Sequence, residues 1–148
     1  MASETDELFS LTKDIAVTAY QKLVEIQSTD MGQVSYFKEV PREMKCFADE
    51  IIEEMIIKRL IPTGISILSE ESGEFGGKSN SSLKFIVDPL DGTVNFVRSL
   101  GPCSISIALY ENDQPIFGVL AMFPSGDLAW GGKGKGSFIN DIPIHVSK

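Results

Sequence analysis

The chain has 148 residues and a formal net charge of −8, with 21 acidic against 13 basic residues. A length of this order fits one domain, which buries about 68–70% of the unfolded chain's surface when it folds. The negative charge argues against non-specific binding to nucleic acid or to an anionic membrane, so we expect no nucleic acid among the partners. Two cysteines are too few for a disulfide framework, and their spacing matches no zinc site.

The N-terminal segment has neither the basic region nor the apolar region of a secretion signal. No apolar run approaches the ~18 residues needed to span a bilayer. We therefore expect a cytoplasmic protein with no membrane partner.

An amphipathic helix is predicted near the N-terminus. From Leu8 to Ile26 apolar residues recur in steps of three and four, which places one apolar stripe on a helix that ends at about Gln27. Thr5 or Asp6 is expected to cap its first turn.

A second helix is predicted to begin near Pro41 or Arg42, because proline is tolerated in a first turn, and to stop before Pro62 and Gly64. Its acidic residues mostly fall off the apolar stripe, which is the usual pattern of a solvated face, with Asp49 as the exception. The predicted apolar face consists of Met44, Phe47, Ala48, Ile51, Met55 and Ile56, and the other acidic residues are Glu50, Glu53 and Glu54.

Several strands are predicted in the rest of the chain, at residues 65–68, 83–87, 104–110 and 115–122, with shorter ones flanking a glycine- and lysine-rich turn at 131–136. The first strand delivers Ser69-Glu70-Glu71-Ser72 at its end. Residues 73–82, rich in Gly, Ser, Asn and Lys, are predicted as a mobile loop. Helices followed mainly by consecutive antiparallel strands indicate an α+β layered domain.

The stretch 84–96, KFIVDPLDGTVNF, carries the strongest functional signal. Pro89 has no N–H and restricts the residue before it, so the strand is predicted to end at Asp88. Asp88, Asp91 and the free carbonyl of Leu90 can then converge in the turn. Carboxylate and carbonyl oxygens are the donors that a hard cation such as Mg²⁺ takes.

The backbone after this turn suits an anion. Gly92 lets the chain approach a ligand closely, and the amides of Gly92, Thr93 and Val94 begin a short helix that would suit a phosphate. Because the chain is acidic, a phosphate bound there needs cations to bridge like charges. Composition and motif therefore agree on a metal.

These motifs also occur in other structural contexts. Taken alone, D-x-x-D-G is more often a solvated Asx turn than a metal site. An EF-hand fits worse, because it needs ligands at every second position and a Glu at the twelfth. The run at 131–136 is not a P-loop, since Lys135 is followed by Gly136 where that loop requires Ser or Thr.

Taken together in this order, the pair Glu70-Glu71, the motif D-P-L-D-G-T-V-N-F at 88–96 and the glycine-rich run at 131–138 resemble the inositol monophosphatase family. The resemblance covers residues 38–147. It implies the N-terminal domain of a sugar-phosphatase-like fold, a layered α/β sandwich with two N-terminal helices packed on a mainly antiparallel sheet. It also implies a Mg²⁺-dependent, lithium-sensitive phosphomonoesterase that uses two or three metal ions.

The resemblance further implies a metal-binding role for four residues. Glu70, Asp88 and the Leu90 carbonyl would hold one ion, and Asp88 and Asp91 would share a second. A bridging aspartate suits the close metal pair that stabilises both the attacking and the leaving oxygen of an in-line displacement.

Catalytic and substrate-binding roles follow from the same resemblance. Glu70 and Thr93 would orient the attacking water, with Asp49 accepting a hydrogen bond from the Thr93 hydroxyl. The phosphate would rest on the amides of Gly92 and Thr93, and Lys38 matches the family's segment near a third metal.

Two features depart from the family. Cys46 stands where the family usually has a threonine, three residues before Asp49. The family's second domain, whose W-D motif supplies a further metal-binding aspartate, begins where this sequence ends. We therefore expect residues 1–148 to form the N-terminal metal-binding domain alone, with activity reduced by orders of magnitude if nothing supplies that ligand.

The expected function is Mg²⁺-dependent hydrolysis of a small phosphomonoester, with inositol monophosphate or a related polyol phosphate as substrate. The V-N-F ending of the motif favours this over nucleotidase relatives, which tend to place a charged pair there. The alternatives are a 3'(2'),5'-bisphosphate nucleotidase, a fructose-1,6-bisphosphatase or a metal-binding module without turnover. The expected partner is a small phosphorylated polyol or sugar, and homodimerisation through exposed apolar edges is left open.

Overall fold

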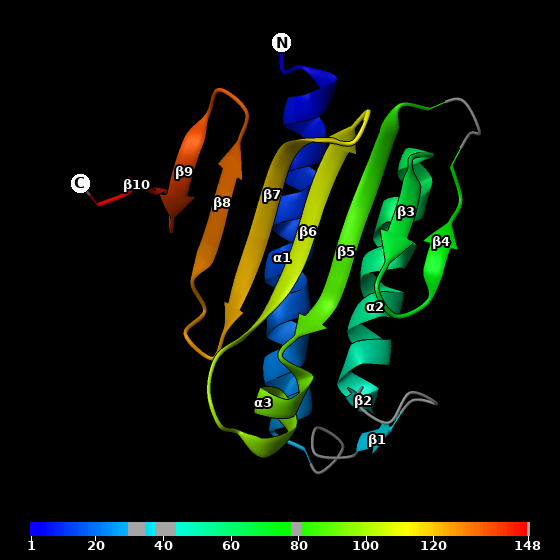
Figure 1. Cartoon of the computed structure of the whole chain (residues 1–148), viewed down its shortest axis with the longest axis vertical. Helices are drawn as coiled ribbons and strands as arrows, with labels where there is room; N and C mark the ends of the chain where they lie inside the picture. Colours follow the sequence, from blue (N-terminus) through cyan, green and yellow to red (C-terminus); the bar gives the residue numbers. More distant parts are fainter. Residues whose placement is uncertain (30–34, 38–43, 78–80, 148) are drawn as a thin grey trace.

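The structure, a computed structural model, describes residues 1–29, 35–37, 44–77 and 81–147. Two long helices lie side by side against one large sheet (Figure 1). The helices are α1 (Glu4–Gln27), α2 (Phe47–Leu60) and the short α3 (Thr93–Arg98), with a 3-10 turn, η2, at Ile61–Thr63. The strands are β1 (Ser35–Phe37), β2 (Met44–Cys46), β3 (Ser66–Ser69), β4 (Gly73–Phe75), β5 (Leu83–Asp91), β6 (Cys103–Glu111), β7 (Gln114–Phe123), β8 (Leu128–Gly132), β9 (Gly136–Ile139) and β10 (Ile142–Ile144).

Helix α1 is capped by Ser3, not by Thr5 or Asp6 as predicted. Oγ of Ser3 accepts from the Asp6 amide at 3.2 Å, and Oδ2 of Asp6 accepts from the Ser3 amide at 3.3 Å. This reciprocal capping box requires an acid three residues after the cap, so Asp6 selects Ser3 and brings Glu4 into the first turn. The predicted end at Gln27 is confirmed.

Helix α2 begins later than predicted, so the start near Pro41 or Arg42 is wrong. Residues 44–46 are extended as β2 and pair antiparallel with β1. Cys46 has φ −133° and ψ 167°, and its amide donates to Oδ2 of Asp49 at 2.8 Å. An acid at the third helical position thus accepts from the residue before the helix, which begins it at Phe47.

The buried face of α2 also differs from the prediction. Phe47 is 39% exposed, whereas the acidic residues Asp49 and Glu53 are 0% and 6% exposed. The prediction that Glu53 belongs to a solvated face is therefore wrong. The buried face consists of Ala48, Asp49, Ile52, Glu53, Ile56, Ile57 and Leu60.

The large sheet has eight strands in the order β10-β9-β8-β7-β6-β5-β3-β4. Only β3 and β5 run parallel; the other neighbours are antiparallel. The expected fold, two helices on a mainly antiparallel sheet, is confirmed. The parallel pair places the carboxyl ends of β3 and β5 at one edge, with Ser69 opposite Val87.

Two strands depart from the predicted boundaries. Residues 73–75, expected in a mobile loop, form β4 because they fold back antiparallel onto β3. Strand β5, expected to end at Asp88, continues to Asp91 with an irregularity in its pairing to β6 between these two residues. A β-bulge of this kind admits Pro89 within a strand, because the ladder is locally interrupted there.

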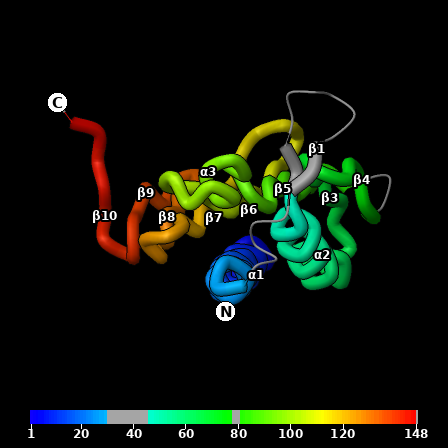
Figure 2. Tube along the Cα trace, turned by 90° about the horizontal axis from the view of Figure 1, so that it is seen from below, coloured from blue at the N-terminus to red at the C-terminus, as the bar shows by residue number. Residues whose placement is uncertain are grey.

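One face of the sheet carries the core. Figure 2 shows α1 and α2 on the same side of the sheet. Phe85 and Val87 of β5 are buried toward these helices, as are alternate residues of β6 and β7, which follows from the two-residue period of a strand. The intervening residues face the opposite side. Within the described part of the chain, no helix combines the length and apolarity needed to cross a membrane.

Candidate functional site

The turn after β5 is built by its own side chains. The amide of Leu90 donates to Oδ1 of Asp88 at 3.2 Å, an Asx turn of the type that D-P sequences favour. Gly92 then starts α3 with φ +93°, a conformation that L side chains rarely adopt. A β-carbon at Gly92 would also lie 3.1 Å from Cβ of Cys103. Both the backbone angle and the close neighbour require glycine here.

The hydroxyl of Thr93 joins this turn to α2. Its Oγ1 lies 3.1 Å from Oδ1 of Asp49 and 3.2 Å from the carbonyl oxygen of Leu90. Asp49 is fully buried, and its other oxygen accepts from the Cys46 amide. The contact expected between Asp49 and Thr93 is therefore present. Since the amide of Cys46 makes the bond to Asp49, a cysteine at this position leaves that hydrogen bond intact.

Burial raises the pKa of Asp49 above its usual value, and the charge of Glu71 adds to this rise. The hydrogen bonds from Cys46 and Thr93 act in the opposite direction because they favour the ionised carboxylate.

Glu70 and Asp88 meet where β3 and β5 end. Burial raises the pKa of Asp88 to about 7, and a hydrogen bond to Glu70 and the charges of Glu70 and Asp91 contribute to the rise. Nearby negative charges disfavour the ionised form of a carboxyl group, so Asp88 retains its proton to a higher pH than a free aspartate. Asp88 is half-buried, whereas Glu70 and Asp91 are exposed to solvent.

A groove opens beside these acids on the sheet face away from α1 and α2. It has a volume of about 550 Å³, and two acidic residues, Glu70 and Asp88, are among the described residues that line it. Ser106 and Tyr110 of β6 add hydroxyl groups, and Ile86 and Ala108 form its apolar floor. The groove is large enough for a small phosphorylated ligand.

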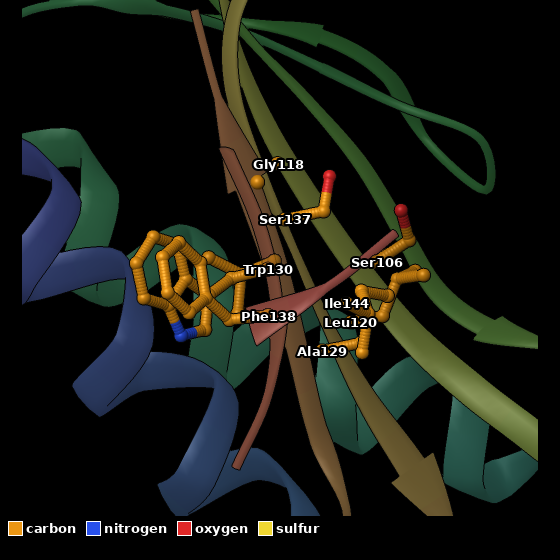
Figure 3. Close-up of a pocket in the computed structure, with 10 residues that line it drawn as sticks. Ser106, Gly118, Leu120, Ala129, Trp130, Ser137, Phe138 and Ile144 are labelled. Atoms are coloured by element: carbon orange, nitrogen blue, oxygen red, sulfur yellow. The ribbon is translucent and has the colours of Figure 1, made fainter. Parts of the chain in front are cut away.

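A second hollow lies on the same face over β6 to β9 and has a volume of about 430 Å³ (Figure 3). Ser106, Leu120 and Ile144 point into it, whereas the rings of Trp130 and Phe138 stack on the side of α1. None of the described residues that line it is ionisable, so of these two hollows it is the first that acidic side chains border.

The predicted donors are carboxylate and carbonyl oxygens, the ligand types that Mg²⁺ prefers. Among the described residues, no three His, Cys, Asp or Glu side chains are arranged to hold an ion together. The predicted sites do not require such a group, because one would combine two carboxylates with the Leu90 carbonyl and the other would use Asp88 and Asp91. The observation that fits a cation here is that two carboxylates from adjacent strand ends, Glu70 and Asp88, border one groove.

Burial favours the protonated thiol in the two cysteines near the site. Burial raises the pKa of Cys46 to about 12 and that of Cys103 to about 11, with the charge of Asp49 adding to both. A protonated thiol is neither a nucleophile nor a metal ligand. Both are free thiols buried in the core.

The structure places Glu70 and Asp88 on one groove, and hydrogen bonds join Thr93 to both Asp49 and Leu90. Asp91 lies at the exposed end of β5 and is not among the described residues that line the groove. Lys38 lies outside the described residues. Sequence reasoning missed Glu53, which is buried beneath the Glu70 turn; its position four residues after Asp49, on the same helical face, was the available signal.

Comparison with solved structures identifies the fold class of this chain. The chain superimposes on the extragenic suppressor protein suhB from Bartonella henselae with a TM-score of 0.87 and 29% identity, over 95% of this chain and 55% of that one. The fold is that of the inositol monophosphatases, a class of layered α/β proteins.

The sequence matches the inositol monophosphatase family over residues 5–148, and the chain belongs to that family. It is 27% identical over 128 residues to the fructose-1,6-bisphosphatase/inositol-1-monophosphatase of Thermococcus kodakarensis, covering 86% of this chain and 49% of the relative. It is 30% identical over 153 aligned positions to human inositol monophosphatase 1, covering all of this chain and 54% of the relative. The chain spans about half the length of these relatives.

Proposed function

We propose that this chain supplies the metal- and phosphate-binding part of a Mg²⁺-dependent phosphomonoesterase that acts on inositol monophosphate or a related polyol phosphate. The observation that carries the proposal is that Glu70 and Asp88, which follow the paired residues Ser69 and Val87 of two adjacent parallel strands, border the same groove. Family membership and the relatives' names support phosphate ester hydrolysis.

The proposal assigns four residues as metal ligands. Glu70, Asp88 and the Leu90 carbonyl would hold one Mg²⁺, and Asp88 and Asp91 a second, with a third ion near Lys38. When bound, the ions would neutralise the phosphoryl oxygens and the developing charge on the attacking and leaving oxygens. Without them, the acidic groove would repel a phosphate ester.

Thr93 and Asp49 would handle the proton of the attacking water. In this proposal the Thr93 hydroxyl and Glu70 orient the water, and the buried Asp49 accepts from the hydroxyl, so that a proton can pass toward Asp49. The amide of Cys46 holds Asp49 in one orientation. The amides of Gly92 and Thr93 would bind the phosphate where the backbone turns into α3.

The first test is metal binding by the chain. Mn²⁺, a paramagnetic substitute for Mg²⁺, is titrated into the protein and the free ion is followed by electron paramagnetic resonance. We expect saturable binding that Mg²⁺ displaces and that Asp88→Asn weakens by at least tenfold, since this residue serves both proposed ions. Binding that is unaffected by Asp88→Asn would contradict the assignment.

The second test is phosphate release from inositol 1-phosphate, 3'-phosphoadenosine 5'-phosphate and fructose 1,6-bisphosphate, with and without Mg²⁺ and Li⁺. We expect Mg²⁺-dependent release that is fastest with inositol 1-phosphate and inhibited by Li⁺. A preference for either of the other substrates would replace inositol phosphate with that alternative. Because the relatives are about twice as long, the same panel is run on this chain extended by the remaining half of a relative.

A further inference from the structure

Glu53 is a buried acid that the proposed chemistry does not use. It lies on α2 with only 6% of its surface exposed, whereas the next residue, Glu54, is exposed. A carboxylate withdrawn from water costs free energy unless hydrogen bonds compensate for the lost hydration.

Glu53 accepts three hydrogen bonds, all from the turn that follows β3. Its Oε1 accepts from the hydroxyl of Ser69 and from the amide of Ser72 at 3.1 Å. Its Oε2 accepts from the hydroxyl of Ser72 at 2.6 Å. Hydrogen bonds to a carboxylate are roughly twice as strong as neutral ones, so the two ends of this turn are firmly held.

Glu70 lies inside the segment that Glu53 holds at both ends. The amide of Glu70 also donates to the carbonyl of Val87 at 3.0 Å, which ties the turn to β5 immediately before Asp88. The backbone that carries Glu70 is therefore held both by hydrogen bonds to Glu53 of α2 and by a hydrogen bond to Val87 of β5. This placement puts Glu70 on the same groove as Asp88, next to the paired residues Ser69 and Val87.

Asp49 and Glu53 are four residues apart on one face of α2, and each binds a different turn. Asp49 accepts from Thr93 in the turn after β5, and Glu53 accepts from Ser69 and Ser72 in the turn after β3. One helical face thus sets the spacing between the two turns that bear the acids.

We propose that Glu53 is a positioning residue for the metal site. It acts through the Ser69–Ser72 turn to place the Glu70 carboxylate against Asp88. This inference rests on the function proposed above, because it assigns Glu70 and Asp88 to the same ion. Outer partners that orient a metal ligand typically change metal affinity by about 10- to 100-fold when they are removed.

The test compares Mn²⁺ affinity in four forms of the chain: the parent, Glu53→Ala, Glu53→Gln and Glu54→Ala. We expect Glu53→Ala to weaken binding by about 10- to 100-fold. Glu53→Gln keeps an oxygen that can accept from Ser69 and Ser72, and should bind within about threefold of the parent. Glu54→Ala removes an equal charge from the neighbouring exposed position and should have no effect beyond that margin.

The glutamine variant separates position from charge. It removes the negative charge of Glu53 but retains the shape of the side chain and most of the hydrogen bonds. Equal losses in Glu53→Ala and Glu53→Gln would mean that Glu53 acts through its charge, and this would overturn the positioning role. Full affinity in Glu53→Ala would overturn it as well.

Amide hydrogen exchange supplies a readout that needs no metal. In Glu53→Ala, the amides of Glu70 and Ser72 should exchange at least tenfold faster, while the amide of Phe96, which donates to Gly92 in α3, should keep its protection. If Glu53→Ala fails to fold, Ser72→Ala, which removes one of the three bonds, is tested for the same two effects at smaller size.

The outcomes distinguish this inference from the proposed function. If the parent chain does not bind Mn²⁺, the proposed function is overturned. Amide hydrogen exchange at Ser72 in Glu53→Ala then decides whether Glu53 holds the turn. Faster exchange at Ser72 with unchanged Mn²⁺ affinity overturns the positioning role, because Glu53 would then be a structural residue only.

Discussion

The hydroxyl of Thr93 lies 3.1 Å from the carboxylate of Asp49, although the two residues are 44 positions apart in the chain. This hydrogen bond joins the end of β5 to the start of α2 and brings a fully buried acid into the candidate site. It therefore has both a structural and a proposed chemical role, which mutation can separate.

Replacing Thr93 with valine keeps the side-chain shape and removes the hydroxyl. Because the buried Asp49 then loses a hydrogen-bond donor, we expect the free energy of unfolding to fall by about 1–3 kcal/mol. Phosphate release should fall by about 100-fold or more if the hydroxyl takes part in proton transfer. Urea unfolding and a phosphate assay measure the two effects.

The matched controls for this prediction are Thr93→Ser and Thr18→Ala. Serine retains the hydroxyl and should preserve most of both properties. Thr18 lies on α1, where its hydroxyl donates to the Asp14 carbonyl and accepts from Nη1 of Arg59 at 3.4 Å, and its removal should change stability by less than about 1 kcal/mol. Undiminished activity in Thr93→Val would exclude the proposed proton path.

The raised pKa of Asp88 predicts how stability depends on pH in the metal-free chain. Asp88 has a pKa of about 7 in the folded state, against 3.8 for the free group. Between about pH 4 and pH 7 the unfolded chain releases this proton while the folded chain retains it. The contribution of Asp88 to the free energy of unfolding should therefore fall as the pH rises through this window.

Urea unfolding of the parent and of Asp88→Asn at several pH values measures this contribution. The variant lacks the titrating group, so it should become more stable relative to the parent from about pH 4 to pH 7, with no further change above pH 7. Mg²⁺ binds the ionised form, and its stabilisation of the parent should increase over the same window. A difference between parent and variant that is independent of pH would contradict the prediction.

Glycine at position 92 should be essential for stability. Gly92→Ala must adopt φ +93° and also displace Cys103, whose Cβ lies 3.1 Å from the new methyl group. We expect a loss of about 2–4 kcal/mol, since backbone strain alone costs about 1–3 kcal/mol. Gly134→Ala is the control, because Gly134 has φ +73° but no atom within 4 Å of the new β-carbon. Gly134→Ala should lose only the part of the free energy of unfolding that comes from backbone strain. Equal losses in the two variants would show that the close approach of Cys103 contributes nothing.

Packing of α1 against the sheet predicts a difference between two adjacent residues. Leu23 is fully buried and Val24 is 43% exposed. Leu23→Ala should lower the free energy of unfolding by about 2–5 kcal/mol because it leaves a cavity in the core. Val24→Ala should lower it by less than about 1 kcal/mol. Thermal unfolding of both variants tests the orientation of the helix, and similar losses would contradict it.

Some of the molecule could be read directly from local patterns. The apolar spacing of residues 8–26 predicted α1 and its end, because helix periodicity is a local property of the chain. The turn at Asp88, Pro89 and Gly92 was predictable for the same reason: proline, Asx and glycine geometry restrict the backbone within a few residues. The alternating strands β6 and β7 were also predicted close to their observed bounds.

Other features depended on contacts between distant segments. Residues 73–75 became a strand because β3 lies beside them, and β5 extended past Asp88 because β6 pairs with Asp91. Glu53 was misassigned to a solvated face because a charge on a helix is usually exposed, and only the β3 turn, folded over α2, supplies the donors that permit its burial.

The sequence alone determined which donors this protein can present: acids, a carbonyl and a hydroxyl concentrated near two strand ends, in an order specific enough to indicate the family. The tertiary structure decided which of these donors meet. Parallel pairing of β3 with β5 places Glu70 beside Asp88, and one face of α2 reaches both turns. Local chemistry fixes what each segment offers, whereas the distances between segments depend on packing that no single segment encodes.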